Sequence, residues 1–293
     1  MADKTGIAWT DSTWPVLAGC KEISPGCANC YSARLTATRL KSQPKYTGLA
    51  VIGANGHPHF TGETRLHQPH LDWPLKWRAP RRIFVADMSD LFYERVTNEE
   101  IAAVFGVMAA CPQHAFQVLT KRADRLPEWF AWAATLARGP HGDGDPRWDH
   151  RPLECWRAAE AAAPRFVNSV WSSETWERVH RIPWPLPNLW LGVSVESRDY
   201  LGRLDELRKV QAAVRFVSFE PLLGDLGTID LTGISWAIVG GESGPGHRPT
   251  EIEWASSILA QCRAAGVACF VKQDSGAKPG WQGRFTDEEW AVK

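Results

Sequence analysis

Short runs of consecutive apolar residues recur along the chain, and polar or charged residues follow each run. The stronger runs are continuously apolar rather than alternating, which is typical of strands buried on both faces of a parallel sheet. We therefore predict strands at residues 7–9, 83–87, 116–120, 189–195, 215–219, 235–239 and 268–272, with a weaker candidate at 59–66.

Helical periodicity occupies several of the intervals between these runs. Residues 98–110 begin with Asn98 and two glutamates and then run apolar, as a helix with a favourable first turn does. Further helices are predicted at residues 28–40, 199–213 and 250–265, and Gly266 can end the last of them. Strands that alternate with helices predict right-handed βα units. The predicted fold is α/β, a full or partial (β/α) barrel in a single domain over residues 1–293.

Residues 138–188 interrupt this alternation with a region rich in proline, tryptophan and charged residues. We interpret the region as an insertion between the fourth and fifth strands. It serves either as a lid over a site or as a surface excursion, and the sequence favours neither.

Composition narrows the class of protein. A chain of 293 residues with 44% hydrophobic residues is long enough for one barrel-sized domain. The formal net charge is zero, so no overall field attracts nucleic acid or an anionic membrane. No apolar stretch approaches the roughly 18 residues of a membrane span, and the first residues lack the pattern of a signal peptide. We expect a cytoplasmic protein with no membrane contact.

Three of the seven cysteines, Cys20, Cys27 and Cys30, lie close together with the spacing C-x6-C-x2-C. They follow the first predicted strand and precede a predicted helix, which in a barrel places them at the C-terminal face. Three thiolates suit a [4Fe–4S] cluster with one iron open to an exchangeable ligand. Two alternatives stay open: an unligated buried set, or a zinc site whose fourth ligand is a distant histidine or cysteine. The available histidines are His57, His59, His67 and His70.

Polar residues and glycines gather at the C-terminal ends of the predicted strands, where barrels build their ligand sites. The candidate cofactor-binding residues are Ser89, Asp90, Thr120, Lys121, Arg122, Ser194, Glu196, Glu220, Gly240, Gly241, Glu242 and Lys272. Arg122 suits a carboxylate or phosphate, because guanidinium binds planar anions bidentately. Structural roles remain possible: a solvated pair for Lys121 and Arg122, a tight turn for Gly240, and an ion pair for Glu220.

Basic and aromatic side chains are interleaved between Trp73 and Arg82, and Arg34, Arg39, Lys41 and Lys45 add positive charge further upstream. Such a stretch suits phosphate contact combined with base stacking. A solvated surface is the alternative. DNA or RNA is therefore a candidate partner.

Several longer strings resemble the phage-associated three-Cys-motif family, which lies within or near the radical S-adenosylmethionine superfamily. They are residues 7–11 (IAWTD), 24–31 (SPGCANCY), 88–92 (MSDLF), 119–122 (LTKR), 218–222 (SFEPL), 239–244 (VGGESG) and 270–273 (FVKQ). The resemblance covers nearly the whole chain outside residues 43–75 and 138–188. The cysteine spacing is a variant, since C-x3-C-x2-C is commonest in the superfamily.

The resemblance implies a radical S-adenosylmethionine enzyme whose three cysteines hold the [4Fe–4S] cluster. S-adenosylmethionine would chelate the open iron, and an electron from a donor such as flavodoxin or ferredoxin would release a 5′-deoxyadenosyl radical. By analogy, the substrate would be a nucleic acid that the enzyme repairs or modifies. The alternative function is a zinc-stabilised, non-catalytic nucleic-acid-binding protein.

Overall fold

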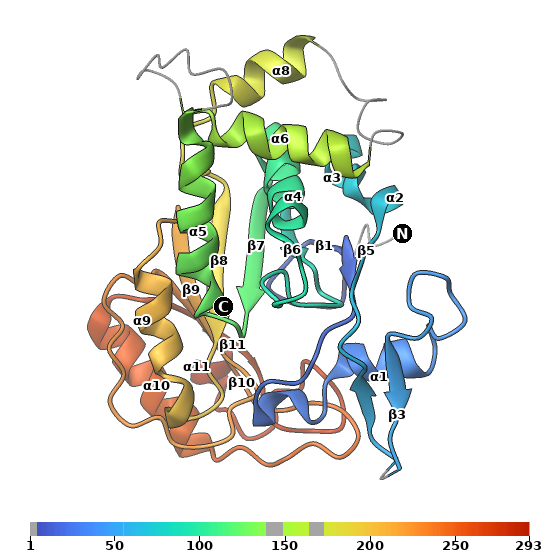
Figure 1. Cartoon of the computed structure of the whole chain (residues 1–293). Helices are drawn as coiled ribbons and strands as arrows, with labels where there is room; N and C mark the ends of the chain where they lie inside the picture. The colour runs from blue at the N-terminus through green and yellow to red at the C-terminus, as the bar shows by residue number, and fades with distance from the viewer. Residues whose placement is uncertain (1–4, 55, 139–148, 164–172, 293) are drawn as a thin grey trace.

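The structure is a computed structural model that describes residues 5–54, 56–138, 149–163 and 173–292. Its centre is a seven-stranded sheet in which every neighbouring pair is parallel and the strands follow chain order. The sheet curls into a half-barrel (Figure 1). Its strands are β1 (Ser12–Trp14), β6 (Arg82–Val85), β7 (Ala115–Thr120), β8 (Leu189–Ser194), β9 (Val214–Phe219), β10 (Trp236–Gly240) and β11 (Ala268–Gln273).

The later predicted strands match this sheet closely, but the first and the weakest do not. The strand predicted at residues 7–9 is wrong, because the first strand begins at Ser12. Residues 59–66 lie outside the main sheet and contribute to two small antiparallel pairs. These pairs are β3 (Ala50–Ile52) with β4 (Pro58–Phe60), and β2 (Leu17–Ala18) with β5 (Arg65–Leu66).

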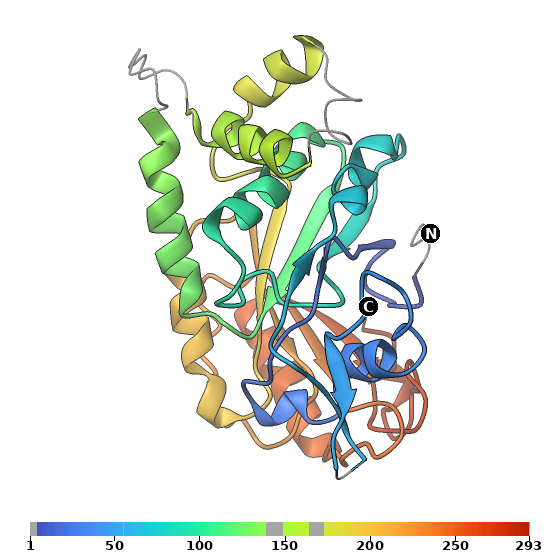
Figure 2. The ribbon, with the colours of Figure 1, turned by 45° about the vertical axis from the view of Figure 1, so that its right-hand side comes forward.

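Helices cover the outer face of the half-barrel, and Figure 2 shows α5 and α9 standing along one side of the sheet. The helix predicted at 98–110 is confirmed, and a capping box between Thr97 and Glu100 starts it. Gly266 ends the predicted C-terminal helix in the left-handed conformation, with φ 67°. The helices of this layer are α4 (Asn98–Ala110), α5 (Arg125–Thr135), α9 (Gly202–Arg208) and α10 (Ile252–Ala265).

The remaining helices are short or belong to connections. The helix predicted at 28–40 is shorter in the structure, and the one predicted at 199–213 begins with a 3-10 turn over Arg198–Tyr200. No helix among the described residues is long and apolar enough to cross a membrane. These helices are α1 (Tyr31–Ala37), α2 (Gln68–Leu71), α3 (Trp73–Lys76), α6 (Arg151–Ala162), α8 (Ser173–His180) and α11 (Asp287–Trp290).

The concave face of the sheet carries a second, smaller core. Successive side chains of a strand face opposite sides of the sheet. The strand residues that alternate with those of the main core therefore point to the concave face. Trp9 is buried there against Phe216, Ile238 and Phe270. We name these four residues the apolar plug. The plug fills the concave face near the amino-terminal ends of the strands and explains why residues 7–9 are apolar without forming a strand.

The described helices of the insertion pack at the amino-terminal end of the sheet. A side chain at Gly106 of α4 would lie 2.2 Å from the carbonyl oxygen of Cys155, so α6 packs backbone against backbone on α4. In Figure 1, α6 and α8 lie at the top and the loop before α1 lies at the bottom. These two helices therefore lie away from the cysteine-bearing loop, and the choice between a lid and a surface excursion stays a prediction. The rest of that prediction concerns residues 139–148 and 164–172, which lie outside the described part.

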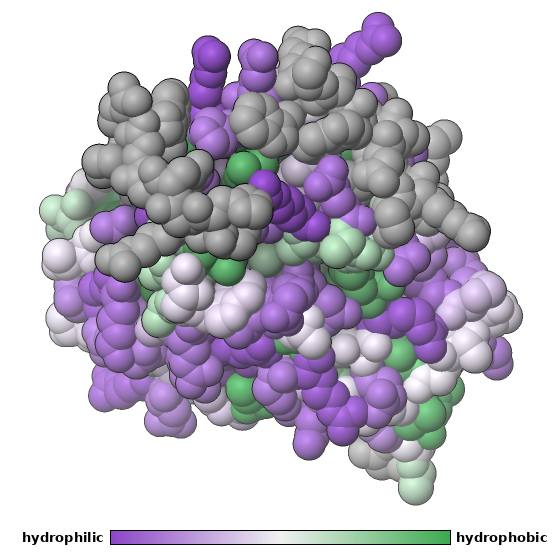
Figure 3. Space-filling model, turned by 45° about the horizontal axis from the view of Figure 1, so that its top comes forward, coloured by the Kyte–Doolittle hydropathy of each residue, from purple (hydrophilic) through white to green (hydrophobic). Residues whose placement is uncertain are grey.

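The stretch from Trp73 to Arg82 lies at this same end, ahead of the first residues of β6. Its basic side chains interact within the chain: Lys76 with Asp72 at 2.7 Å, and Arg82 with Asp11 at 2.9 Å. Hydrophilic residues predominate on the visible part of the face in Figure 3, with small hydrophobic patches between them. A nucleic acid bound along this stretch would lie at the opposite end of the sheet from the three cysteines.

Candidate functional site

The three clustered cysteines lie on one loop at the carboxyl end of the sheet. We name residues 19–30 the cysteine loop; it follows β2 and leads into α1. Pro25 opens a 3-10 turn that ends at Cys27, because its fixed φ suits a first helical position. The backbone N–H of Cys30 then donates to the Cys27 carbonyl oxygen at 3.1 Å. Cys20, Cys27 and Cys30 are all free thiols with partial exposure.

Three thiols on one short loop are a donor set that a metal centre can use, and the identity of that centre stays a prediction. Among the described residues, no group of three His, Cys, Asp or Glu side chains is placed to hold one metal ion.

The four histidines considered as a fourth zinc ligand have contacts of their own, and the zinc alternative stays a prediction. His57 directly precedes β4, and His59 lies within it. The rings of His67 and His70 pack on each other with centroids 4.1 Å apart. The ring of His70 also packs on Trp73 with a centroid separation of 3.6 Å. No fourth ligand from these histidines joins the cysteines in a group that could hold an ion.

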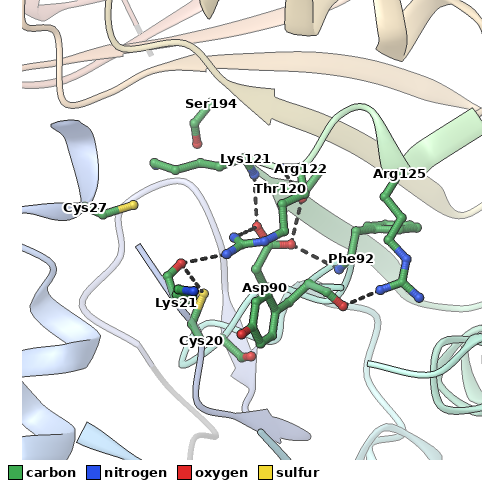
Figure 4. Close-up of polar contacts among 12 residues, drawn as sticks. Cys20, Lys21, Cys27, Asp90, Phe92, Thr120, Lys121, Arg122, Arg125 and Ser194 are labelled. Atoms are coloured by element: carbon green, nitrogen blue, oxygen red, sulfur yellow. Dashed lines mark hydrogen bonds and ion pairs between the residues drawn. The ribbon is translucent and has the colours of Figure 1, made fainter. Parts of the chain in front are cut away.

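Asp90 and Arg122 form a buried polar cluster beside Cys20 (Figure 4). The Asp90 carboxylate accepts from the Thr120 hydroxyl at 2.7 Å and from the Lys121 backbone N–H at 3.0 Å. The Arg122 guanidinium contacts the same carboxylate at 3.2 Å. Polar groups that are buried this deeply need hydrogen-bond partners in the protein. The same contacts join the carboxyl ends of β6 and β7.

Glu196 is fully buried at the end of β8 and contacts the cysteine loop directly. Its carboxylate accepts from the Ser24 hydroxyl at 2.5 Å and from Arg203 Nη1 at 2.7 Å. The ammonium of Lys121 lies 3.5 Å from the same carboxylate. A Cβ at Gly26 would lie 2.4 Å from Glu196 Oε1, so only glycine lets the loop pass this close to the carboxylate.

Glu242, which follows β10, also contacts the cysteine loop through its carboxylate. Its Oε2 accepts from Asn29 Nδ2 at 2.9 Å and from Arg248 Nε at 3.0 Å. Burial alone would raise the pKa of Glu242, but the hydrogen bonds from Arg248 and Asn29 outweigh burial and lower it. Glu242 is therefore an ionised anchor for the C-terminal part of the cysteine loop.

A polar floor lies on the concave face beyond the apolar plug. Strand alternation places Ser194, Ser218 and Gly240 on the same side of the sheet as the plug and nearer the carboxyl ends. Beside them, Lys272 Nζ donates to Glu220 Oε1 at 2.5 Å, so the ion pair considered for Glu220 is confirmed. A ligand placed between this floor and the cysteine loop would meet small residues and one ion pair.

The remaining predicted site residues have internal contacts. The Ser89 hydroxyl donates to the Gly19 carbonyl oxygen, which joins the start of the cysteine loop to the end of β6. A side chain at Gly241 would lie 2.3 Å from the backbone nitrogen of Ser275, so close packing of two loops requires this glycine. A cofactor-binding role for either residue stays a prediction.

Two ionisable groups near the loop have pKa values moved toward neutrality. Burial raises the pKa of Asp87 to about 6, although Lys45 and Thr13 oppose the shift. Burial also lowers the pKa of Lys45 to about 8, and its ammonium lies 3.1 Å from His70 Nδ1.

The thiol of Cys20 is shifted in the other sense, away from neutrality. Burial raises the pKa of Cys20 to about 12, with a smaller contribution from Asp90.

Sequence reasoning missed several residues that shape the site: Ser24, Asn29, Arg203 and Arg248. Lys45, which we predicted as part of a basic surface, is instead buried and donates to the Pro15 carbonyl oxygen. Glycine at position 26 was a usable signal, because a cysteine turn with glycine indicates a close approach by another group. The others carried no signal, since arginines in predicted helices and loops are ordinarily solvated.

Known proteins give one comparison that bears on this chain. No curated protein matches it, and neither does any solved structure. One family model matches residues 4–288, and the family is described as "Protein of unknown function (DUF5131)". Because the match spans nearly the whole length, the chain belongs to this DUF5131 family.

Proposed function

We propose that this protein is a radical S-adenosylmethionine enzyme that uses a cluster held by Cys20, Cys27 and Cys30. The observation that carries the proposal is the cysteine loop: three free, partly exposed thiols at the carboxyl end of a parallel half-barrel. When bound, the cluster would supply the electron that cleaves S-adenosylmethionine and starts radical chemistry.

The chain's own residues supply position and shielding around that chemistry. The polar floor of Ser194, Ser218 and Gly240 lies on the concave side of the sheet, and its small side chains and hydroxyls suit contact with a ligand's rings and hydroxyls. Glu220 and Lys272 present one ion pair with partial exposure, at 16% and 20% of each side chain. A charged pair with partial exposure can bind the polar groups of an amino acid or a ribose. Below it, the apolar plug excludes water from the amino-terminal side.

We assign the substrate to the nucleic acids, as the resemblance of the sequence suggests. Exposed basic residues occur at the cysteine face as well: Lys21 in the loop, and Arg39 and Lys41 just after α1. Phosphate contacts from such residues would position a strand at the cysteines, whereas the Trp73 to Arg82 stretch would not.

The test is anaerobic reconstitution of the full chain with iron and sulfide. We expect about four irons per chain and thiolate-to-iron absorbance. Adding dithionite and S-adenosylmethionine should yield 5′-deoxyadenosine, measured by chromatography, with flavodoxin or ferredoxin as candidate natural donors. Cys27→Ala should abolish iron binding and product. Cys111→Ala, which removes a buried thiol outside the loop, is the matched control and should retain both.

The substrate assignment has its own measurement. Anisotropy of a labelled single-stranded oligonucleotide should show weaker binding after Lys21, Arg39 and Lys41 are changed to alanine, with a shallower salt dependence. The control changes Lys76 and Arg78 to alanine at the other end of the sheet. Equal loss in both variants would contradict a strand path across the cysteine face, and a reconstituted cluster that never cleaves S-adenosylmethionine would refute the enzyme.

A further inference from the structure

Two arginines connect the carboxyl end of the sheet to the cysteine loop. Arg122, which follows β7, donates from Nη2 to the Lys21 carbonyl oxygen at 2.6 Å. Arg248, in the connection after β10, donates from Nη2 to the Pro25 carbonyl oxygen at 2.9 Å. Lys21 is the residue directly after Cys20, and Pro25 lies in the 3-10 turn that ends at Cys27. The arginines therefore hold the loop beside two of its cysteines.

A carboxylate at a strand end orients each arginine. Asp90 contacts Arg122 Nη1 at 3.2 Å, and Glu94 accepts from Arg122 Nε at 3.1 Å. Glu242 takes Arg248 in a two-pronged contact, with Nε at 3.0 Å and Nη2 at 2.5 Å. Two parallel bonds fix the plane of a guanidinium. Because these donors already have partners in the chain, both arginines are better suited to positioning the loop than to binding a cofactor carboxylate.

The contacts explain the long gap between the first two cysteines. Lys21, Ser24 and Pro25 all lie within the six-residue interval, and each contacts a side chain that follows a strand of the main sheet. After the gap, Asn29 donates to Glu242 at 2.9 Å. A shorter interval would lack the residues that make these contacts. The variant spacing is therefore the length that the loop needs to span β7, β8 and β10.

The same arrangement places charged side chains next to two sulfur ligands. At Cys20 the effect of the Asp90 carboxylate exceeds that of Arg122, so this pair brings no net positive charge to the sulfur. Arg248 interacts electrostatically with Cys27 and brings a positive charge to that part of the loop. An iron–sulfur centre becomes more negative on reduction, and its potential depends on nearby charge and on hydrogen bonds around the sulfurs.

From this geometry we infer that Arg122 and Arg248 are positioning residues that hold the cysteine loop, and that Arg248 also stabilises the reduced state of the centre the loop carries. The second half of the inference rests on the proposed function, and the first half does not. Asp90 and Glu242 act through the two arginines, and Glu196 holds the middle of the loop independently of them.

The experiment compares Arg248→Gln, Arg248→Lys and Arg122→Lys with the wild-type chain. Arg122→Lys keeps a charge beside buried Asp90 and so avoids an unpaired carboxylate. Arg263→Gln is the control, because Arg263 is exposed and pairs with Glu288 on another face. Amide hydrogen exchange of residues 20–30 is measured on the full chain without iron. Iron content and midpoint potential follow after anaerobic reconstitution, by dithionite titration with spectroscopic detection.

We expect exchange in the loop to rise by about tenfold or more in Arg248→Gln, the order expected when a charge-assisted hydrogen bond is lost. Both lysine variants should show smaller increases, since lysine keeps the charge but not the planar fork. The midpoint potential should fall in Arg248→Gln and change less in Arg248→Lys. Exchange equal to wild type would overturn the positioning role, and an unchanged potential would overturn the charge role. A wild-type chain that binds no iron refutes the proposed function, while the exchange data still decide on the positioning role.

Discussion

The Ser24 hydroxyl donates a 2.5 Å hydrogen bond to Glu196 across 172 positions of sequence. The carboxylate that accepts it is fully buried, and Arg203 contacts its other oxygen at 2.7 Å. The bond joins the middle of the cysteine loop to the end of β8. Loop geometry therefore depends on a strand far away in the chain.

Ser24→Ala should destabilise the fold by about 1–3 kcal/mol, because it leaves a buried carboxylate oxygen short of a partner. Urea unfolding followed by circular dichroism gives the free energy of unfolding. Ser257→Ala is the control: this serine is exposed on α10, and its loss should change stability by no more than about 0.5 kcal/mol. Equal effects of the two substitutions would show that the Glu196 contact contributes nothing to stability.

Gly106→Ala should destabilise the protein although the residue lies within a helix. Alanine ordinarily stabilises a helix interior by about 1 kcal/mol relative to glycine. Here the new Cβ would lie 2.2 Å from the Cys155 carbonyl oxygen and would push α6 away from α4. We expect a loss of about 1–3 kcal/mol in thermal or urea unfolding.

Gly202→Ala provides the comparison for Gly106→Ala. Gly202 opens α9, and a Cβ there meets nothing within 4 Å among the described atoms. Its substitution should be neutral or stabilising. If both variants are stabilised alike, α6 does not pack on α4 as described.

Asp87→Asn should stabilise the protein at neutral pH and lose this advantage in acid. Burial raises the pKa of Asp87 from 3.8 to about 6, so the folded state binds more protons than the unfolded state between these values. The free energy of unfolding therefore falls as pH rises through this window, and the full cost remains above it. Removing the charge should recover up to about 3 kcal/mol at pH 7.5. Melting curves at about pH 4.5 and 7.5 measure the difference.

Asp11→Asn should show the opposite dependence. The side-chain hydrogen bond with Arg82 lowers the pKa of Asp11, so its contribution to stability is present at neutral pH and disappears as pH falls through the folded-state pKa. This variant should be less stable than wild type at neutral pH and approach it in acid. The same sign for both variants would mean that burial does not control Asp87.

Trp9→Ala should cost about 3–5 kcal/mol, as for other large buried aromatics. Trp9 is 4% exposed and its ring lies 4.8 Å from that of Phe84, between centroids. Urea unfolding measures the loss. A Trp9→Phe variant should recover part of it, since a smaller ring still fills some of the apolar plug. Wild-type stability in Trp9→Ala would mean that the plug does not close the concave face.

Buried strands and capped helices were the predictable part of this fold. Residues 116–120 and 189–195 have continuous apolar runs, and the structure has β7 and β8 there because both faces of those strands are covered. Residues 7–9 looked the same over three positions, yet they form no strand, and Trp9 packs into the apolar plug. A run that short does not distinguish a strand from a buried loop.

The position of the cysteine loop was also predictable, but its contacts were not. The loop follows the first strand and precedes a helix. In an α/β sheet this order places Cys20, Cys27 and Cys30 at the carboxyl end of the strands. The partners of that loop, such as Glu196 and Arg248, are set by which strand ends meet in space. No local pattern reports such long-range pairing, so arginine and glutamate at these positions looked like cofactor ligands or solvated residues.

The docking of α6 on α4, at the amino-terminal end of the sheet, has a practical consequence for labelling and fusion. Probes or affinity tags placed on α6 would sit at the far end of the strands from the thiols, and so would leave entry to the polar floor unobstructed. A chain that is immobilised or labelled through α6 would keep its cysteine loop free to meet a ligand during a binding measurement. Because α6 touches the main body through Gly106, such an attachment should avoid the side of α6 that carries Cys155.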